Sequence, residues 1–187
     1  MPFTFTETEI PGLYIVKPHC HQDQRGSNLK IFHKPTFLEM GLPCAFGETM
    51  ITTNLHQNVI RGFHFQRPPY AQYKLYYCLQ GEWNNYSVDL RKGSPTYGVV
   101  ICINMCQEEE KLLYIPEGIA NAHLILRENT RVLYQLGAQY MPEHDAGVRW
   151  DSLGIDFGEI TPIITEKDAA LPPFSQLESP FVFGENC

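Results

Sequence analysis

The sequence predicts an all-β protein folded as a closed or sandwiched β-barrel. From residue 50 onward, runs of apolar and β-branched residues alternate with turn residues, near the spacing of about 8–12 residues that barrels and sandwiches show. A content of 14 Gly, 14 Pro and 12% aromatic residues also favours many strands joined by tight turns. The length of 187 residues is that of one large domain, so we expect residues 1–187 to form a single domain.

The amino-terminal part predicts strands and one helix. The apolar run 13–16 ends at Pro18 and, with the apolar residues that precede it, indicates one or two opening strands. Pro35 stands at the start of the segment 35–40 and Gly41 stands just past its end. This asymmetry is typical of a short helix. We expect no other helix.

The strands of the predicted barrel follow in order, each bounded by turn residues such as Gln80-Gly81 and Gly93-Ser94-Pro95. We expect them at residues 50–53, 74–79, 83–90, 97–105, 111–115, 123–126 and 131–136. The tail after Trp150 is rich in Pro and Gly and lacks a helical period. It is therefore expected to wrap the barrel instead of forming a second domain.

Charge and cysteine usage exclude several classes of protein. A formal net charge of -7 argues against a nucleic-acid partner, because such proteins need a positive field to displace counterions from phosphates. The six cysteines include Cys187, form no CxxC pair and follow no secretory leader, which indicates a cytoplasmic protein without disulfides. No apolar stretch approaches the roughly 20 residues that span a bilayer, so we expect no membrane partner.

The densest polar cluster is the segment 61–66, which contains His64. If residues 60–66 form a strand, then Ile60, Gly62, His64 and Gln66 share one face, because side chains alternate with period two. His64 would then point into the barrel, where an imidazole can accept a proton near neutral pH. A lone histidine of this kind is more often a core residue satisfied by a backbone carbonyl.

Two cations accompany His64. Arg61 and Lys74 lie close to it in sequence, and in an acidic protein such cations suggest an anion or a developing oxyanion as their target. The alternative is that both are ordinary surface charges. Lys74 sits in an otherwise apolar strand, which favours an inward side chain. Arg91 and Lys92 follow a turn and are expected on a solvated rim.

Tyr134 and Tyr140 are further candidates. A tyrosine hydroxyl inside a barrel can donate a proton to the face opposite a histidine base, although both residues could be plain core or rim aromatics. Asn121 and His123 are two residues apart, so they share a face if the strand extends back to them. Either could equally belong to a loop. No histidine and carboxylate spacing supports a metal site.

These residues stand in motifs that resemble the cupin-fold dTDP-4-dehydrorhamnose 3,5-epimerases, over about residues 10–170. The motifs that carry the resemblance are separated along the chain: Asp23-Gln24-Arg25-Gly26, residues 59–66, Gln72-Tyr73-Lys74-Leu75, residues 88–98, Ile115-Pro116-Glu117-Gly118, Tyr134 with Tyr140, and residues 164–168. The resemblance implies a cupin-type jelly roll and an isomerase that needs no cofactor.

The resemblance also implies roles for individual residues. His64 corresponds to the catalytic base, Asp168 to the carboxylate paired with it, Tyr134 to the acid on the opposite face and Lys74 to the group that stabilises the enolate. The substrate, a nucleotide-linked 4-keto sugar, is expected to contact Arg25, Arg61, Gln66, Asn121, His123, Tyr140 and Glu143. A ketone at C4 acidifies the hydrogens at C3 and C5, which makes this chemistry possible.

Three departures from the family pattern bear on the substrate. The second histidine of the family is Asn121 here, an aspartate of the family is Asn85, and the Gln and Asn that precede the segment beginning at Arg61 in the family are replaced by residues 54–58. Residues 54–59, together with Asn121 and His123, resemble the subgroup that epimerises GDP-4-keto-heptoses, whereas residues 64–69 keep the rhamnose-type pattern. The nucleotide (dTDP, GDP or CDP), the sugar, and the choice of C3, C5 or both stay open.

Two other functions fit the same scaffold. A nucleotide-sugar 3,4-ketoisomerase would suit the missing second histidine but would not need Tyr134 opposite His64. A non-catalytic sugar-binding cupin would exchange no ketosugar hydrogen with solvent, since a fold alone does not determine a function. The family resemblance also implies a homodimer, which would cover sheet edges.

Overall fold

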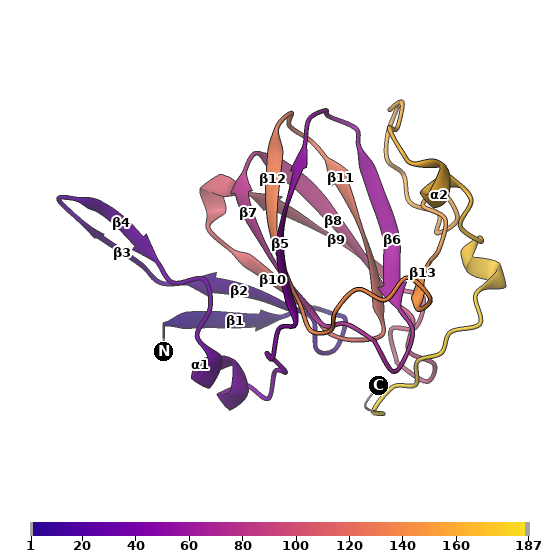
Figure 1. The fold of residues 1–187 in the computed structure, drawn as a ribbon, viewed down its shortest axis with the longest axis horizontal. Helices are drawn as coiled ribbons and strands as arrows, with labels where there is room; N and C mark the ends of the chain where they lie inside the picture. The colour runs from indigo at the N-terminus through magenta and orange to yellow at the C-terminus, as the bar shows by residue number, and fades with distance from the viewer. Residues whose placement is uncertain (1, 186–187) are drawn as a thin grey trace.

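Two antiparallel β-sheets face each other in the computed structural model, which describes residues 2–185 (Figure 1). The first sheet has the order β1 (Phe3–Glu7), β2 (Tyr14–Pro18), β10 (Leu112–Ile115), β7 (Lys74–Gln80), β12 (Thr130–Leu136) and β5 (Glu48–Asn54). The second has the order β13 (Asp145–Gly147), β6 (Ile60–Gln66), β11 (Ile119–Ile125), β8 (Glu82–Asp89) and β9 (Val100–Cys106). Consecutive strands often lie in different sheets, as in a jelly roll.

Every strand expected from residue 50 onward forms, and the two opening strands are β1 and β2. The predicted helix is α1 (Lys34–Glu39), with Pro35 in its first turn. The expectation of a single helix is wrong, because the described chain has a second one, α2 (Glu166–Ala169). Four residues are too short to show a helical period in the sequence.

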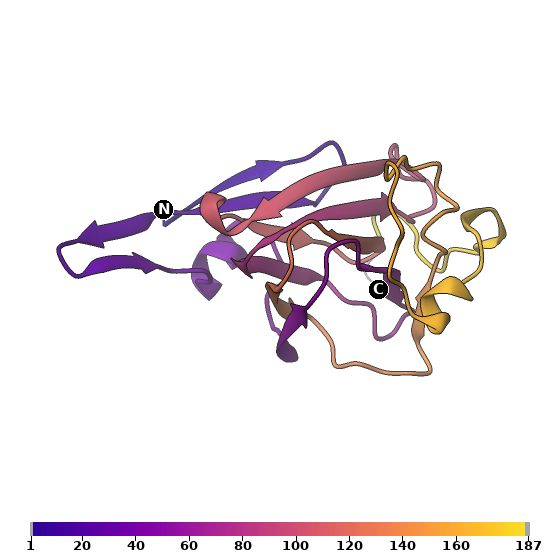
Figure 2. The same ribbon diagram turned by 90° about the horizontal axis from the view of Figure 1, so that it is seen from above.

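Strands β3 (Cys20–Asp23) and β4 (Gly26–Leu29) form a hairpin that the sequence did not predict. It projects away from the sheets, on the side opposite the carboxyl-terminal tail (Figures 1 and 2). Nearly all of its residues are exposed, so it lacks the alternation of apolar and polar residues that marks a half-buried strand.

The main core lies between the two sheets. It is built from alternate residues of the facing strands, among them Tyr76 of β7, Trp83 of β8, Met105 of β9 and Val132 of β12, all at most 3% exposed. Because side chains of a strand alternate between faces, the intervening residues pack outward against other parts of the chain.

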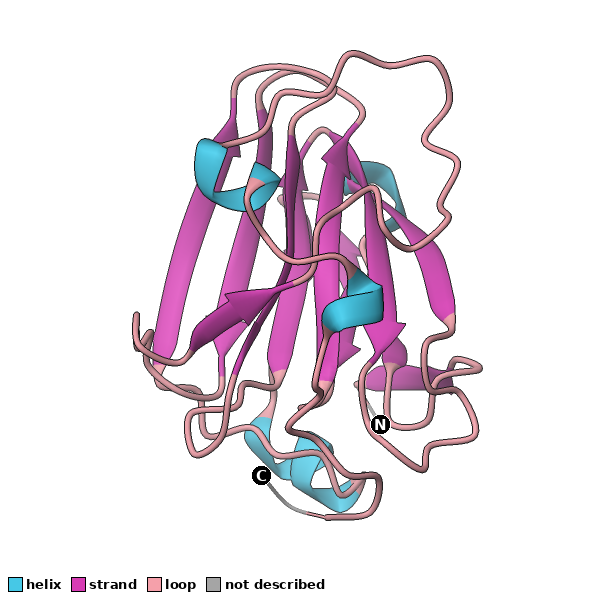
Figure 3. Cartoon of the chain, turned by 90° about the vertical axis from the view of Figure 1, so that its right-hand side faces the viewer, coloured by secondary structure: helices cyan, strands magenta, loops and turns pink. Residues whose placement is uncertain are grey.

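The outer face of the second sheet is covered by the tail. Phe63, Val88 and Leu124 pack there against tail residues that include Trp150 and Phe181. The tail and α2 lie in front of the strands when the molecule is viewed from that side (Figure 3). The wrapping tail expected from the sequence is confirmed. On the first sheet, α1 and the segment after it cover the outer face.

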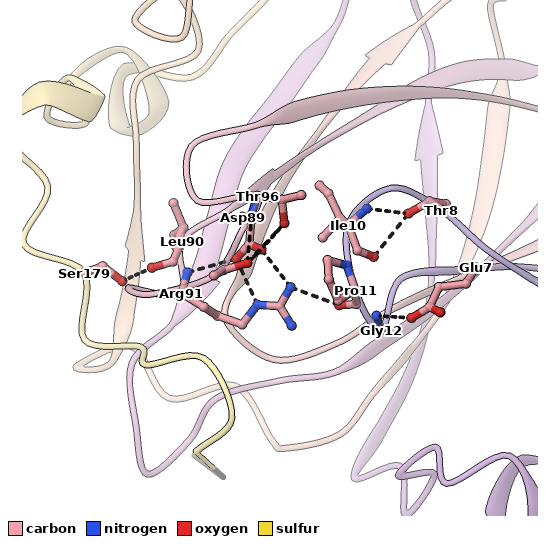
Figure 4. A network of polar contacts seen from close by, with 11 residues as sticks. Glu7, Thr8, Ile10, Pro11, Gly12, Asp89, Leu90, Arg91, Thr96 and Ser179 are labelled. Carbon is pink, nitrogen blue, oxygen red and sulfur yellow. Dashed lines mark hydrogen bonds and ion pairs between the residues drawn. The ribbon is translucent and has the colours of Figure 1, made fainter.

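Polar contacts around a buried ion pair join both ends of the chain to the barrel: Arg91 reaches Pro11 near the amino terminus, and beside it Ser179 of the tail donates to the Leu90 carbonyl (Figure 4). Asp89 is fully buried and accepts hydrogen bonds from Arg91, Ser94 and Thr96, while Arg91 also donates to the Pro11 carbonyl. Burial raises the pKa of Asp89, but these donors together hold that pKa below its ordinary value. The expectation of a solvated rim is wrong for Arg91, because a buried carboxylate requires its charge. Lys92 is exposed as expected.

Five cysteines lie within residues 2–185, and all five are free thiols: Cys20, Cys44, Cys78, Cys102 and Cys106. The sixth, Cys187, lies outside the described residues. Burial raises the pKa of Cys78 to about 12, so this thiol stays protonated at neutral pH. No helix of this part of the chain is long and apolar enough to cross a membrane.

Candidate active site

A cavity of about 440 Å³ opens between the sheets where β5 faces β6, beside α2. The cavity gathers nine of the eleven site residues expected from the sequence: His64, Tyr134, Asp168, Lys74, Arg61, Gln66, Asn121, His123 and Tyr140. They come from β6, β7, β11, β12, α2 and the segment after β12. Residues more than 100 positions apart in the chain therefore meet at one site.

The strand that carries His64 departs from strict alternation. Ile60 packs with Phe63 beneath the tail, while Arg61 joins His64 at the cavity, so the expectation that Ile60 shares a face with His64 is wrong. The cause is a β-bulge in the pairing of β6 with β11, where the register shifts by one residue. Gly62 lies at the bulge with φ +111°, and a Cβ there would sit 2.4 Å from the Asn121 carbonyl oxygen.

Asp168 orients His64. Its Oδ1 lies 3.2 Å from His64 Nε2, and its Oδ2 accepts a hydrogen bond of 3.3 Å from the Gly62 backbone N–H. Burial raises the pKa of Asp168, but the hydrogen bond and charge of His64 and the Gly62 N–H hold that pKa below its ordinary value. The carboxylate is therefore ionised at neutral pH and places the proton of a neutral His64 on Nε2.

Backbone hydrogen bonds between the tail and β6 hold Asp168 in this position. Ile163 forms a parallel bridge with Val59, the Ile60 N–H donates to the Ile163 carbonyl, and the Ile163 N–H donates to the Asn58 carbonyl. These bonds hold the tail against the start of β6. Thr165 then caps α2 by accepting from the Asp168 N–H at 3.1 Å.

Lys74 lies inside the barrel, as expected, and is 5% exposed. Its Nζ donates to Asn121 Oδ1 at 2.7 Å and to the His64 carbonyl at 3.2 Å. Burial lowers the pKa of Lys74 to about 8, and the negative charge of Asp145 opposes that shift. The lysine is thus a cation at pH 7 whose charge the protein solvates poorly.

Tyr134 and His123 form a second polar pair on the same cavity. The Tyr134 hydroxyl lies 3.0 Å from His123 Nδ1. Burial raises the pKa of Tyr134, although Thr52 and Arg61 oppose the shift, so the phenol keeps its proton at neutral pH. Burial, then the charges of Lys74, Arg61 and His64, hold the pKa of His123 well below its ordinary value. His123 is therefore neutral.

The rim of the cavity is built by the segment after β12. The Tyr140 hydroxyl donates to Asp145 Oδ2 at 3.0 Å, and Lys167 pairs with the same carboxylate. Gln66 uses its amide on the backbone, donating to the Tyr70 and Gln139 carbonyls and accepting from the Met141 N–H. Gln66 therefore holds this segment in place at the mouth of the cavity.

Two expected site residues do not reach the cavity of their own chain. Arg25 lies at the turn of the β3–β4 hairpin, where its side chain is 90% exposed and pairs with Asp23 at 2.6 Å. The hairpin lines a separate, open hollow of about 730 Å³ that contains none of His64, Lys74 and Tyr134. Glu143 is exposed and does not line the cavity around His64.

Several cavity residues were not expected from the sequence, among them Thr52, Tyr76, Asp145 and Lys167. Tyr76 lies two residues after Lys74 on β7, so the period of two could have placed it on the inner face. Asp145 belongs to a strand of three residues, which is too short to give a signal. Within residues 2–185, no group of three or more His, Cys, Asp or Glu side chains could hold a metal ion.

Comparisons with known proteins agree on one family. The sequence model described as dTDP-4-dehydrorhamnose 3,5-epimerase matches residues 7–176. The dTDP-4-dehydrorhamnose 3,5-epimerase of Methanothermobacter thermautotrophicus is 35% identical over 179 residues, which cover 93% of this chain and 96% of the relative.

Solved structures show the same fold. The dTDP-6-deoxy-D-glucose-3,5-epimerase of Legionella pneumophila, in complex with dTDP-4-keto-L-rhamnose, has a TM-score of 0.89 and 26% identity, covering 99% of this chain and 100% of its own. The dTDP-4-dehydrorhamnose 3,5-epimerase of Bacillus anthracis, with TDP and PPi bound, has a TM-score of 0.87 and 30% identity, covering 91% and 99%. The cupin-type jelly roll expected from the sequence is confirmed.

The close approach at Gly62 predicts that a side chain at this position lowers the stability of the fold. In Gly62→Ala, the new methyl group meets the Asn121 carbonyl and the positive φ disfavours a side chain, so the free energy of unfolding should fall by about 3 kcal/mol or more. Gly93→Ala is the matched control, because φ is +82° there but no atom lies within 4 Å of the added Cβ. Gly93→Ala should lower the free energy of unfolding, measured by urea denaturation, by about 1 kcal/mol. Equal losses in the two variants would contradict the close approach at Gly62.

Proposed function

The chain belongs to the dTDP-4-dehydrorhamnose 3,5-epimerase family, and we propose that it epimerises a nucleotide-linked 4-keto-deoxysugar at C3, C5 or both. In this reaction a base removes a proton next to the C4 ketone, the charge moves onto the C4 oxygen, and an acid returns a proton to the opposite face. The reaction is redox-neutral, so the proposal needs no cofactor.

The observation that carries this proposal is the His64–Asp168 pair at the cavity. With Nε2 held by Asp168 at 3.2 Å, the lone pair of a neutral His64 is on Nδ1, which has no hydrogen-bond partner within residues 2–185. The His64 side chain is 31% exposed, so a ligand in the cavity can reach it. We therefore assign His64 as the base and Asp168 as the group that orients it and stabilises its charged form.

Lys74 supports the proposal as the group that stabilises the enolate. A buried ammonium gains more from an adjacent negative charge than a solvated one does, because few water dipoles screen it. Lys74 also lies within 3.2 Å of the backbone of His64, so cation and base act at the same end of the cavity.

Tyr134 supports the second half of the reaction. Its phenol is protonated at neutral pH, faces the cavity and lies on β12 of the first sheet, whereas His64 lies on β6 of the second. A substrate between the sheets would therefore meet the base and the acid from different strands on facing sheets. This arrangement favours inversion at carbon over removal and return of a proton by one group.

For the nucleotide, we propose dTDP before GDP or CDP. The Legionella relative is described with dTDP-4-keto-L-rhamnose and the Bacillus relative with TDP. The expected substrate contacts that line the cavity are Arg61, Gln66, Asn121, His123 and Tyr140.

A contact between Arg25 and the substrate requires a second copy of the chain, because the β3–β4 hairpin projects away from its own cavity. The homodimer expected from the family resemblance would supply that copy. Both the dimer and the cytoplasmic location remain predictions, and sedimentation of the protein measures the first directly.

Solvent exchange tests the function. In deuterated water with dTDP-4-keto-6-deoxyglucose, we expect deuterium at C3, C5 or both by NMR, together with an epimerised product. His64→Ala should slow the exchange by about 10² or more, because the base is lost. His56→Ala is the matched control, since His56 is exposed and lies outside the cavity, and it should exchange at the rate of the wild type.

The result that contradicts the proposal is exchange at neither carbon with any of the dTDP-, GDP- and CDP-linked 4-keto sugars. That result would leave a sugar-binding protein. A product whose ketone has moved to C3 would instead identify a ketoisomerase. Undiminished exchange in His64→Ala would refute the assignment of His64 as the base, but not the proposed function.

The role of Lys74 predicts a pH dependence. The cation is required, and its pKa is lowered to about 8, so kcat/KM should fall as the pH rises through about 8. In Lys74→Arg the guanidinium keeps its charge in this range, so this variant should be slower but lose the fall near pH 8. A fall at the same pH in both proteins would contradict the assignment.

A further inference from the structure

A chain of buried polar side chains crosses the inner surface of the cavity, from Lys74 through Asn121 and His123 to Tyr134. The successive distances are 2.7 Å from Lys74 Nζ to Asn121 Oδ1, 3.2 Å from Asn121 Nδ2 to His123 Nε2, and 3.0 Å from His123 Nδ1 to the Tyr134 hydroxyl. Asn121 and His123 are only 4% and 3% exposed. The proposed function gives catalytic roles to the two ends of this chain but no catalytic role to its middle.

Lys74 determines which way the Asn121 amide points. An ammonium group can only donate hydrogen bonds, so the atom 2.7 Å from it must be the amide oxygen. The Tyr76 hydroxyl donates to the same oxygen at 3.4 Å. The amide nitrogen is thereby turned toward His123 Nε2, and because an amide NH₂ can only donate, Nε2 must be the acceptor.

The tautomer of His123 follows from that contact. A neutral imidazole carries one proton, so an accepting Nε2 leaves the proton on Nδ1, which faces the Tyr134 oxygen. Burial keeps the pKa of His123 low, which is consistent with the neutral form. The ring centroid lies 4.1 Å from Trp83 and 4.9 Å from Tyr76, and this packing holds the ring orientation.

We propose that Asn121 and His123 are positioning residues that hold Tyr134 as a hydrogen-bond acceptor, so that its own proton is directed at the substrate. The proposal rests on the proposed function, in which Tyr134 is the acid. With the opposite tautomer, His123 would accept the Tyr134 proton and compete with the substrate for it. The contact between Asn121 and His123 excludes that tautomer.

In this geometry each proton has a donor and an acceptor. His64 takes the proton from carbon, and the resulting enolate is stabilised by Lys74. The O–H bond of Tyr134 then breaks as the new C–H bond forms, the ketone is restored, and the phenolate accepts the Nδ1–H of neutral His123. Exchange with solvent returns a proton to Tyr134 and removes one from His64. A hydrogen bond to the charged form of an acid makes that acid stronger.

The first test needs no substrate. In protein with ¹⁵N-labelled histidine, NMR should find His123 protonated on Nδ1 and unprotonated on Nε2. Protonation on Nε2 would overturn the proposal. Titration of ¹³Cζ-labelled tyrosine should also show a higher pKa for Tyr134 in His123→Leu than in the wild type. An unchanged Tyr134 pKa would overturn the proposal as well.

The second test separates positioning from a structural role. In deuterated water, His64 can return deuterium to the face from which it took the proton, so exchange without inversion reports proton removal alone. In His123→Leu, the yield of epimer for each exchange event should fall about tenfold, with total exchange within about threefold of the wild type. His123→Asn is the matched variant, because its amide nitrogen can replace Nδ1 as the donor and should restore most of the yield.

The outcomes distinguish this proposal from the proposed function. If the wild type exchanges no sugar hydrogen, the function fails, while the tautomer and the Tyr134 titration still decide the arrangement of the polar chain. If exchange and inversion fall together in His123→Leu, or if His123→Asn is no better than His123→Leu, the positioning role is refuted.

Discussion

The contact between His64 and Asp168 joins two parts of this protein that lie far apart in sequence. The barrel supplies the imidazole and the tail supplies the carboxylate, 3.2 Å away and 104 positions later. The same carboxylate accepts the Gly62 N–H at the bulge, and the apolar tail covers the sheet behind it. Folding the tail onto the barrel therefore completes both the core and the site.

Buried charge shapes the chemistry that the cavity can perform. Lys74 donates to neutral partners, the Asn121 amide and a backbone carbonyl, and burial lowers its pKa to about 8. A bound enolate would place a negative charge in direct contact with this ammonium, which in the free protein donates only to neutral groups. Elsewhere in the molecule the buried carboxylate Asp89 has its cation, Arg91, in place. The arrangement around Lys74 suits the stabilisation of a reaction intermediate, whereas the Asp89–Arg91 pair suits the stability of the fold.

The sequence predicted most of the fold, because alternation and turn residues mark strands that have one face in a core. It predicted an inward Lys74 because this residue lies in an otherwise apolar strand. It identified Asp168 only through resemblance, since no local pattern connects residue 168 to residue 64. Alternation failed at residues 60–66, where the bulge at Gly62 brings Arg61 and His64 to one face. The β3–β4 hairpin and Asp145 gave no signal, because exposed or very short strands carry no hydrophobic period.

The substitution Asp168→Asn tests the central claim most directly. The Gly62 N–H requires an acceptor, so the amide oxygen of the substituted side chain should take that place and leave its NH₂ facing His64 Nε2. This contact would move the imidazole proton to Nδ1 and block the base. We predict that kcat for epimerisation falls by about 10³–10⁴ with little change in KM, as expected for a base held in the wrong tautomer. A variant that keeps a kcat within tenfold of the wild type would contradict the account.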